Sequence, residues 1–157
     1  MSSIVFKSAK QHAIAIQKRS IKAIDLLEAY FEQIDKFNPE INAVIWQDRK
    51  AAKEIAWQID KETATGNFRG PLHGVPMTVK ESFNLSGAPT TWGDPKNIHN
   101  IAKTDSDAIA RLRSAGAIVF GKTNVPLNLV EWHTFNKIYG TTNNPWDPTR
   151  TPGGSSG

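Results

Sequence analysis

The spacing of apolar residues in the first third of the chain predicts three amphipathic helices. The clearest pattern covers residues 21–37, where apolar side chains recur at steps of three and four residues and would share one helical face. These side chains are Ile24, Leu27, Tyr30, Phe31, Ile34 and Phe37. A weaker pattern covers residues 8–19, and a third helix is expected to begin after Asp48 and to close at Gly66. Each helix needs a surface on which its apolar face can pack.

Residues that start and stop helices set the expected boundaries. Ser20 is expected to cap the helix over residues 21–37. Asn38–Pro39 is expected to end it, because proline disfavours the helical conformation in the residue before it. Thr104–Asp107 has the spacing of a capping box, with Asp in place of the usual Glu, and predicts a helix that stops at Gly116.

Three short apolar runs are expected to form strands. They cover residues 43–46, 75–79 and 117–120, and the last follows directly on the helix that stops at Gly116. A helix followed at once by an apolar strand is typical of an α/β unit. We find no internal repeat and no flexible linker, so residues 1–157 are interpreted as part of one domain.

Composition limits the classes of protein to which the chain can belong. Hydrophobic residues make up 39% and charged residues 22%, as in a soluble globular domain. The net charge of +4 comes from basic residues spread among acidic ones, which argues against a nucleic-acid partner. The chain has no cysteine, so disulfides and thiolate chemistry are excluded. Residues 1–7 do not resemble a signal peptide and no apolar run is long enough to span a membrane, so we expect a cytoplasmic protein.

Residues 116–123 match the phosphate-loop pattern G-x-x-x-x-G-K-T. The residues between the two glycines are Ala, Ile, Val and Phe, which favour a strand whose N–H groups are paired in a sheet. A phosphate loop needs a flexible backbone whose N–H groups converge on the anion. Pro126 also follows too soon for Lys122 and Thr123 to open a long helix. We therefore predict that this segment does not bind nucleotide.

Histidines and carboxylates give no clear site. The four histidines, His12, His73, His99 and His133, lack the spacing of metal ligands and are interpreted as surface or packing residues. Glu81, Asp105 and Asp107 could form a carboxylate pair for glycosidic or metal chemistry. For Asp105 and Asp107, a place at the start of a helix is the better explanation, because the helix dipole favours negative charge there.

Lys80 and the segment 153–157 are the candidates for catalysis. Lys80 follows an apolar strand, and an amine in an apolar pocket loses its proton more easily than one in water. A neutral amine can accept a proton from a serine hydroxyl. Residues 153–157, Gly-Gly-Ser-Ser-Gly, also fit a flexible linker, and a lysine after a strand is often only a solvated end. The stiff, proline-rich approach over residues 144–152 argues against a linker.

These stretches together resemble the amidase signature family of serine hydrolases, and the resemblance covers nearly the whole chain. The stretches that carry it are Phe37–Ala43, Gly70–Pro76, Lys80, Leu112–Ile118, Gly121–Pro126, Gly140–Asp147 and Thr151–Gly157. Each stretch is modest alone, but their order and spacing are specific. The resemblance implies an α/β fold with a mixed central sheet that has helices on both sides, of which this chain is the N-terminal part.

The resemblance also implies a mechanism. Lys80 matches the general base of the family, and Ser155 matches the serine that relays a proton and follows a cis peptide bond, here Gly154–Ser155. The nucleophilic serine and the oxyanion hole of the family lie beyond Gly157, so the isolated chain is expected to be inactive. The reaction of the family, hydrolysis of an amide through an acyl-serine, uses no metal and no cofactor.

Residues near the relay serine are expected to bind the substrate. By the resemblance, residues 127–132 lie over the acyl site, and Leu129 would form an apolar wall beside Ser155. This favours a small-molecule amide with an apolar acyl group. Glu81 and Phe83 are weakly closer to the fatty-acid-amide branch of the family than to the glutamyl-tRNA amidotransferase branch.

Two other classes of function remain open on sequence grounds. One is a truncated, non-catalytic protein that only binds a partner. The other is a subunit completed by a second chain that carries the C-terminal half, as in an amidotransferase. An exposed sheet edge and uncovered apolar helix faces also make self-association an expected property.

Overall fold

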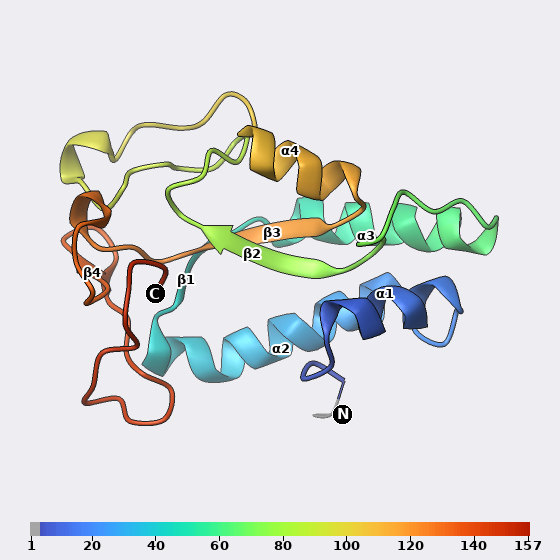
Figure 1. Ribbon diagram of the computed structural model, residues 1–157, viewed down its shortest axis with the longest axis horizontal. Helices are drawn as coiled ribbons and strands as arrows, with labels where there is room; N and C mark the ends of the chain where they lie inside the picture. The colour runs from blue at the N-terminus through green and yellow to red at the C-terminus, as the bar shows by residue number, and fades with distance from the viewer. Residues whose placement is uncertain (1–3) are drawn as a thin grey trace. The chain divides into compact units, whose positions relative to one another are not determined.

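The computed structural model describes residues 4–157, so residues 1–3, part of the segment judged not to be a signal peptide, lie outside it (Figure 1). The chain divides into two compact units. The first contains residues 1–34, 48–77 and 110–120. The second contains residues 35–47, 78–109 and 121–157. That residues 1–157 form part of one domain stays a prediction.

Helices and strands largely follow the predicted order. The helices are α1 (Ala9–Gln17), α2 (Ala23–Ile41), α3 (Arg49–Ala64) and α4 (Asp107–Ser114). The strands are β1 (Val44–Gln47), β2 (Pro76–Lys80), β3 (Ile118–Thr123), β4 (Phe135–Asn136) and β5 (Gly140–Thr141). The sequence patterns therefore located α1 to α4 and the three strands of the larger sheet.

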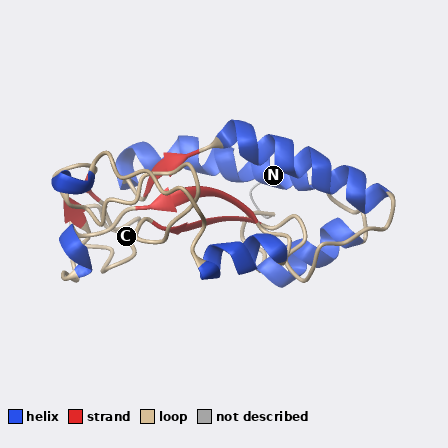
Figure 2. Ribbon diagram, turned by 90° about the horizontal axis from the view of Figure 1, so that it is seen from above, coloured by secondary structure: helices blue, strands red, loops and turns tan. Residues whose placement is uncertain are grey.

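The larger sheet has the strand order β1-β3-β2 and is mixed. β1 and β3 are antiparallel, with Trp46 opposite Lys122. β2 and β3 run parallel, because hydrogen bonds join Gly74 to Gly116 before the strands and Glu81 to Thr123 after them. Figure 2 shows strands in red and helices in blue. The predicted α/β class with a mixed sheet and accompanying helices is confirmed.

One apolar core holds the first unit together. It joins the inward faces of α1, α2 and α3 to the first half of β3. Its buried members are Ile16, Ala23, Leu26, Leu27, Phe31, Ala52, Ala56, Ile59, Ile118 and Phe120. The rings of Phe31 and Phe120 meet edge to face at 5.3 Å, a favourable arrangement for two aromatic rings. This core explains the periodic apolar pattern of the three helices.

The predicted N-cap of α2 is wrong. The helix begins at Ala23, and the Ser20 hydroxyl instead donates to the carbonyl of Ala15 at the end of α1. The first free N–H groups of α2 are satisfied by a distant carboxylate, because Asp60 on α3 accepts from Ala23 at 2.7 Å and from Ile24 at 3.2 Å. A tertiary contact thus replaces the local cap, and local spacing could not reveal it.

The predicted end of α2 at Asn38–Pro39 is also wrong. The helix runs on to Ile41 with Pro39 inside it, and Asn42 then adopts a left-handed conformation with φ of 53°. The Asn38 side chain accepts from the N–H groups of Ala43 and Val44, at 2.9 and 2.8 Å. This side chain anchors the residues after the helix and fixes its last turn in place, despite the proline.

Two further boundary predictions have different outcomes. Asp48 caps α3 as predicted, with its carboxylate 2.9 Å from the Ala51 nitrogen. The capping box at Thr104–Asp107 is wrong in frame, because α4 begins only at Asp107. Asp105 accepts from the backbone N–H of Ser86 and so binds the preceding loop.

The segment that matches the phosphate-loop pattern is a strand, as predicted. β3 runs through Gly121, Lys122 and Thr123, and all three of these residues are paired with β1. A Cβ atom on Gly121 would lie 2.9 Å from the carbonyl oxygen of Trp46. The glycine is therefore explained by close strand packing and not by an anion site.

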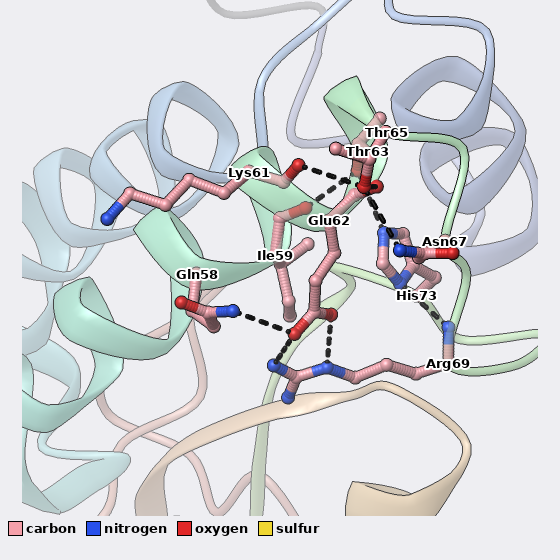
Figure 3. A network of polar contacts seen from close by, with 9 residues as sticks. All are labelled: Gln58, Ile59, Lys61, Glu62, Thr63, Thr65, Asn67, Arg69 and His73. Atoms are coloured by element: carbon pink, nitrogen blue, oxygen red, sulfur yellow. Dashed lines mark hydrogen bonds and ion pairs between the residues drawn. The ribbon is translucent and has the colours of Figure 1, made fainter.

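His73 in the first unit is buried, and its polar contacts indicate which ring nitrogen carries the proton (Figure 3). Its Nδ1 atom accepts from the backbone N–H of Arg69 at 3.1 Å, so the proton of the neutral ring is on Nε2. Nε2 then donates to the Thr63 hydroxyl at 2.8 Å, and this hydroxyl donates to the carbonyl of Ile59. Burial lowers the pKa of His73, which favours the neutral ring in the folded protein.

The free energy of unfolding should fall as the pH drops below about 6.5. In that range the unfolded chain protonates His73 more readily than the folded chain, whose pKa is lowered, so the unfolded state binds more protons. The loss is at most about 1.4 kcal/mol per pH unit. Urea unfolding at pH 7 and pH 5 measures it. The variant His73→Gln should lose this part of the slope, and an unchanged slope would show that His73 is not its source.

Candidate active site

Lys80 and Ser155 lie next to each other in the second unit. Lys80 is the last residue of β2, and its Nζ atom donates a hydrogen bond of 2.6 Å to the Ser155 hydroxyl, 75 residues further along the chain. Both side chains are half-buried. The end of β2 thus places the Lys80 amine against the glycine-serine segment, and the fold brings together Lys80 and Ser155, the two residues singled out from the sequence.

The glycine-serine segment has a special backbone. The peptide bond between Gly154 and Ser155 is cis, the conformation implied by the resemblance, and Gly153 has φ of 93°. A Cβ atom on Gly154 would lie 2.8 Å from the carbonyl oxygen of Glu131, so only glycine fits this position without a shift. The Thr134 hydroxyl donates to the carbonyl of Gly153 at 2.9 Å. The segment is held in place and does not behave as a free linker.

A pocket of about 240 Å³ opens beside Ser155. It is lined by Leu129, Val130, Glu131, Trp132, Gly154 and Ser155. The two residues expected to bind substrate, Leu129 and Ser155, therefore line the same pocket. Val130 and Trp132 are largely exposed, and the lining of the pocket is mixed, with slightly more polar than apolar surface.

The turn that carries Leu129 is strained. Asn128 and Leu129 have φ of 49° and 64° within the short 3₁₀ turn Leu127–Leu129. A bulky residue such as leucine rarely adopts this left-handed conformation, so the surroundings must enforce it. The N–H of Asn128 donates to the carbonyl of Trp92 at 2.7 Å and ties the turn to a second loop.

Two buried charged residues near this site were not identified from the sequence as a pair. Glu81 and Lys122 are both fully buried. Glu81 accepts from the N–H groups of Thr91 and Trp92, and its pairing with Asp105 or Asp107 stays a prediction. The only sequence signal was a charged residue beside an apolar run, and many solvated residues share that pattern.

Lys122 has an altered acidity. Burial lowers its pKa to about 8, and the negative charge of Glu81 opposes part of that shift. Its ammonium group donates to the carbonyl of Pro89 and, at 3.0 Å, to the hydroxyl of Thr90. These bonds compensate the charge that burial penalises.

Within residues 4–157, no three His, Asp or Glu side chains gather in a way that could hold a metal ion. His12 bonds through Nε2 to the carbonyl of Ile4 at 2.7 Å, and His73 belongs to the network of Figure 3. The helices of this described part are also too short or too polar to cross a membrane.

Comparison with known proteins identifies the family. Residues 25–157 match the model of the family described as Amidase. The chain belongs to the amidase family. Among curated amidase-family proteins, an indoleacetamide hydrolase of Bradyrhizobium diazoefficiens is 42% identical over 150 residues, which are 96% of this chain and 29% of that protein. A glutamyl-tRNA(Gln) amidotransferase chain from Acidothermus cellulolyticus is 34% identical over all of this chain and 31% of its own length.

Solved amidase structures share the fold. The native peptide amidase of Stenotrophomonas maltophilia superposes with a TM-score of 0.88 at 28% identity, over 96% of this chain and 32% of that one. This chain therefore spans about 30% of the length of the family members that it matches. At the level of the family, the chain is related to amide hydrolases and to amidotransferase subunits.

Proposed function

We propose that this chain supplies the base and the proton relay of an enzyme that hydrolyses amides through an acyl-serine intermediate. The observation that carries the proposal is the 2.6 Å hydrogen bond between Lys80 Nζ and Ser155 Oγ. Membership of the amidase family supports it independently. Lys80 is the general base, and Ser155 is the residue through which the proton passes.

The proposed proton transfers use the contact between Lys80 and Ser155 in the opposite sense to the observed hydrogen bond, with the amine as the acceptor. The Lys80 amine takes the proton of the Ser155 hydroxyl while Ser155 takes the proton of a nucleophilic serine, whose oxygen attacks the amide carbonyl carbon. When the carbon–nitrogen bond breaks, the proton returns through Ser155 to the leaving amine. Water then cleaves the acyl ester by the same relay, and the serine is restored.

The nucleophilic serine is proposed to lie outside these 157 residues. Support comes from the resemblance, which places this serine in a glycine-rich turn after Gly157. We propose that the same polypeptide carries it in the natural protein, and not a second chain, because the matched region is only 29% and 31% of the polypeptides of two relatives. The 157-residue chain by itself is then inactive.

The proposed substrates are small linear amides with an apolar acyl group. Leu129, Val130 and Trp132 contribute apolar side chains to the lining of the pocket beside Ser155, together with the polar residues Glu131 and Ser155. The name of the indoleacetamide hydrolase agrees with an aromatic acyl group of this kind. A small polar amide such as acetamide would leave this apolar surface uncovered and should be a poorer substrate.

Ammonia release from indole-3-acetamide tests the proposal. The natural protein that contains this sequence should release ammonia from indole-3-acetamide faster than from acetamide, and the 157-residue chain should release none from either. The intact mass of the natural protein, compared with 17.3 kDa for this chain, shows which of the two has been assayed. Hydrolysis by the 157-residue chain, or no hydrolysis of any aryl or alkyl amide by the natural protein, would contradict the proposal.

A further inference from the structure

Two oppositely charged, fully buried side chains lie where β2 and β3 end in the second unit. Glu81 directly follows Lys80, and Lys122 is the penultimate residue of β3. The backbone N–H of Glu81 donates to the carbonyl of Thr123 at 3.0 Å, which ties the two strand ends together. Neither charge belongs to the proposed proton relay, so their burial needs another explanation.

Both side chains direct their hydrogen bonds at the same four-residue loop, residues 89–92. Lys122 donates to the carbonyl of Pro89 and the hydroxyl of Thr90. Glu81 accepts from the N–H groups of the next two residues, Thr91 and Trp92, the latter at 3.0 Å. The cation thus binds the oxygen atoms of the loop and the anion binds its N–H groups, which fixes each of the four residues.

The last residue of this loop is held in an unfavourable conformation. Trp92 has φ of 55°, a left-handed value that a bulky residue rarely adopts. Its N–H is bound by the Glu81 carboxylate, and its carbonyl accepts from Asn128 at 2.7 Å. Asn128 in turn begins the left-handed pair that ends at Leu129, on the wall of the pocket beside Ser155.

We infer that Glu81 and Lys122 are positioning residues, which fix the loop 89–92 and, through Trp92 and Asn128, the place of Leu129 in the pocket. The assignment of this pocket to the substrate rests on the proposed function. The series of contacts is independent of that function, because it runs from Glu81 to Trp92, from Trp92 to Asn128, and along the backbone to Leu129.

A purely stabilising role explains these residues less well. Buried charges are costly, and replacing them by apolar residues of similar size is often neutral or stabilising. What an apolar pair could not supply is the set of directed bonds to a loop in a strained conformation. The precise placement of a pocket wall needs such bonds.

Amide hydrogen exchange followed by NMR in the 157-residue chain tests the inference. The variant Glu81→Gln keeps the size of the side chain but replaces a charged acceptor by a neutral one. Exchange at Thr91, Trp92 and Asn128 should accelerate about tenfold, the difference expected between charged and neutral acceptors. Amides of α3 serve as the reference and should not change. The matched control Glu62→Gln removes a carboxylate charge bound to Arg69 in the first unit and should leave all three amides unchanged.

Each outcome decides the inference. Faster exchange at Thr91 and Trp92 but not at Asn128 would show that the effect stops at the loop. Equally faster exchange at every amide would show a global loss of stability. Either result would overturn the inference. If Glu81→Gln does not fold, Glu81→Asp keeps the charge on a shorter side chain. It should accelerate the same three amides by a smaller factor, and no change there would also overturn the inference. The exchange is measured without substrate, so its failure is separate from a failure of the ammonia assay.

Discussion

Replacing Lys80 with alanine is expected to lower kcat for amide hydrolysis roughly 10²–10⁴-fold in the natural protein, the usual contribution of a general base. The hydrogen bond between Lys80 and Ser155 offers the only proton route that the proposed mechanism uses. Because the base acts in the transition state and not in substrate binding, KM should change little and kcat/KM should fall with kcat. Initial rates over a range of indole-3-acetamide concentrations separate the two parameters.

Three further variants make the result specific. Lys103→Ala removes an exposed lysine in the same unit and should leave the rate unchanged. Ser155→Ala should slow hydrolysis by a factor similar to that of Lys80→Ala. Because Lys80 and Ser155 act in the same proton transfer, the double variant should hydrolyse the amide only a little more slowly than either single variant. A Lys80→Ala enzyme with nearly normal kcat would exclude Lys80 as the base.

Raising the pH from about 8 toward 10 is expected to stabilise the folded chain through Lys122. The pKa of this buried ammonium is lowered from 10.5 to about 8, so between these values the unfolded chain holds a proton that the folded chain has released. The unfolded state then binds more protons, and the free energy of unfolding rises with pH by up to about 1.4 kcal/mol per unit. The full gain is about 3 kcal/mol, a large fraction of the stability of a small domain.

Urea unfolding between pH 7.5 and 9.5 measures the larger part of this gain. Tyr30 and Tyr139, whose pKa values burial raises, act in the opposite direction only near and above pH 10. The variant Lys122→Met has a side chain of similar length without a titrating group and should lack the rise. A rise of equal size in Lys122→Met would mean that other groups produce it, and a flat profile in the unchanged chain would mean that Lys122 titrates normally.

Local apolar patterns were enough to predict the main elements because those elements bury one face. The pattern over residues 21–37 matches most of the face that α2 turns to the core, although Phe37 is exposed and the buried Leu26 was not part of the pattern. The apolar runs before Lys80 and Gly121 are β2 and β3. The apolar run within residues 116–123 also argued against a nucleotide site there, because strand-forming residues pair their N–H groups with a neighbouring strand.

Boundaries failed where a distant residue replaced a local one. Ser20 has the right chemistry for an N-cap, but Asp60, which lies on α3, binds the first N–H groups of α2. Only the fold determines that α2 and α3 meet there. The roles of Glu81 and Lys122 were hidden for the same reason, because a buried charge is recognised by its partners and not by its neighbours in sequence.

The candidate site was predictable mainly through the resemblance. Composition and spacing alone left Lys80 as a possible solvated strand end and residues 153–157 as a possible linker. The order of the short motifs singled out Lys80 and Ser155, and their separation of 2.6 Å in the folded chain agrees with that choice. The turn at Asn128 and Leu129 could not be foreseen, because nothing in the sequence around this asparagine marks a left-handed turn and leucine rarely enters one.

Lys80 and Glu81 are neighbours in sequence, yet one meets Ser155 and the other meets the loop 89–92. Lys80 is the last residue of β2 and Glu81 is the first residue of the turn that follows, so a single strand end serves two different places. Deleting one residue at the end of β2 would put the Glu81 carboxylate in the place of the Lys80 amine, opposite Ser155. Homologous chains should therefore vary in side chains along β2 far more readily than in its length.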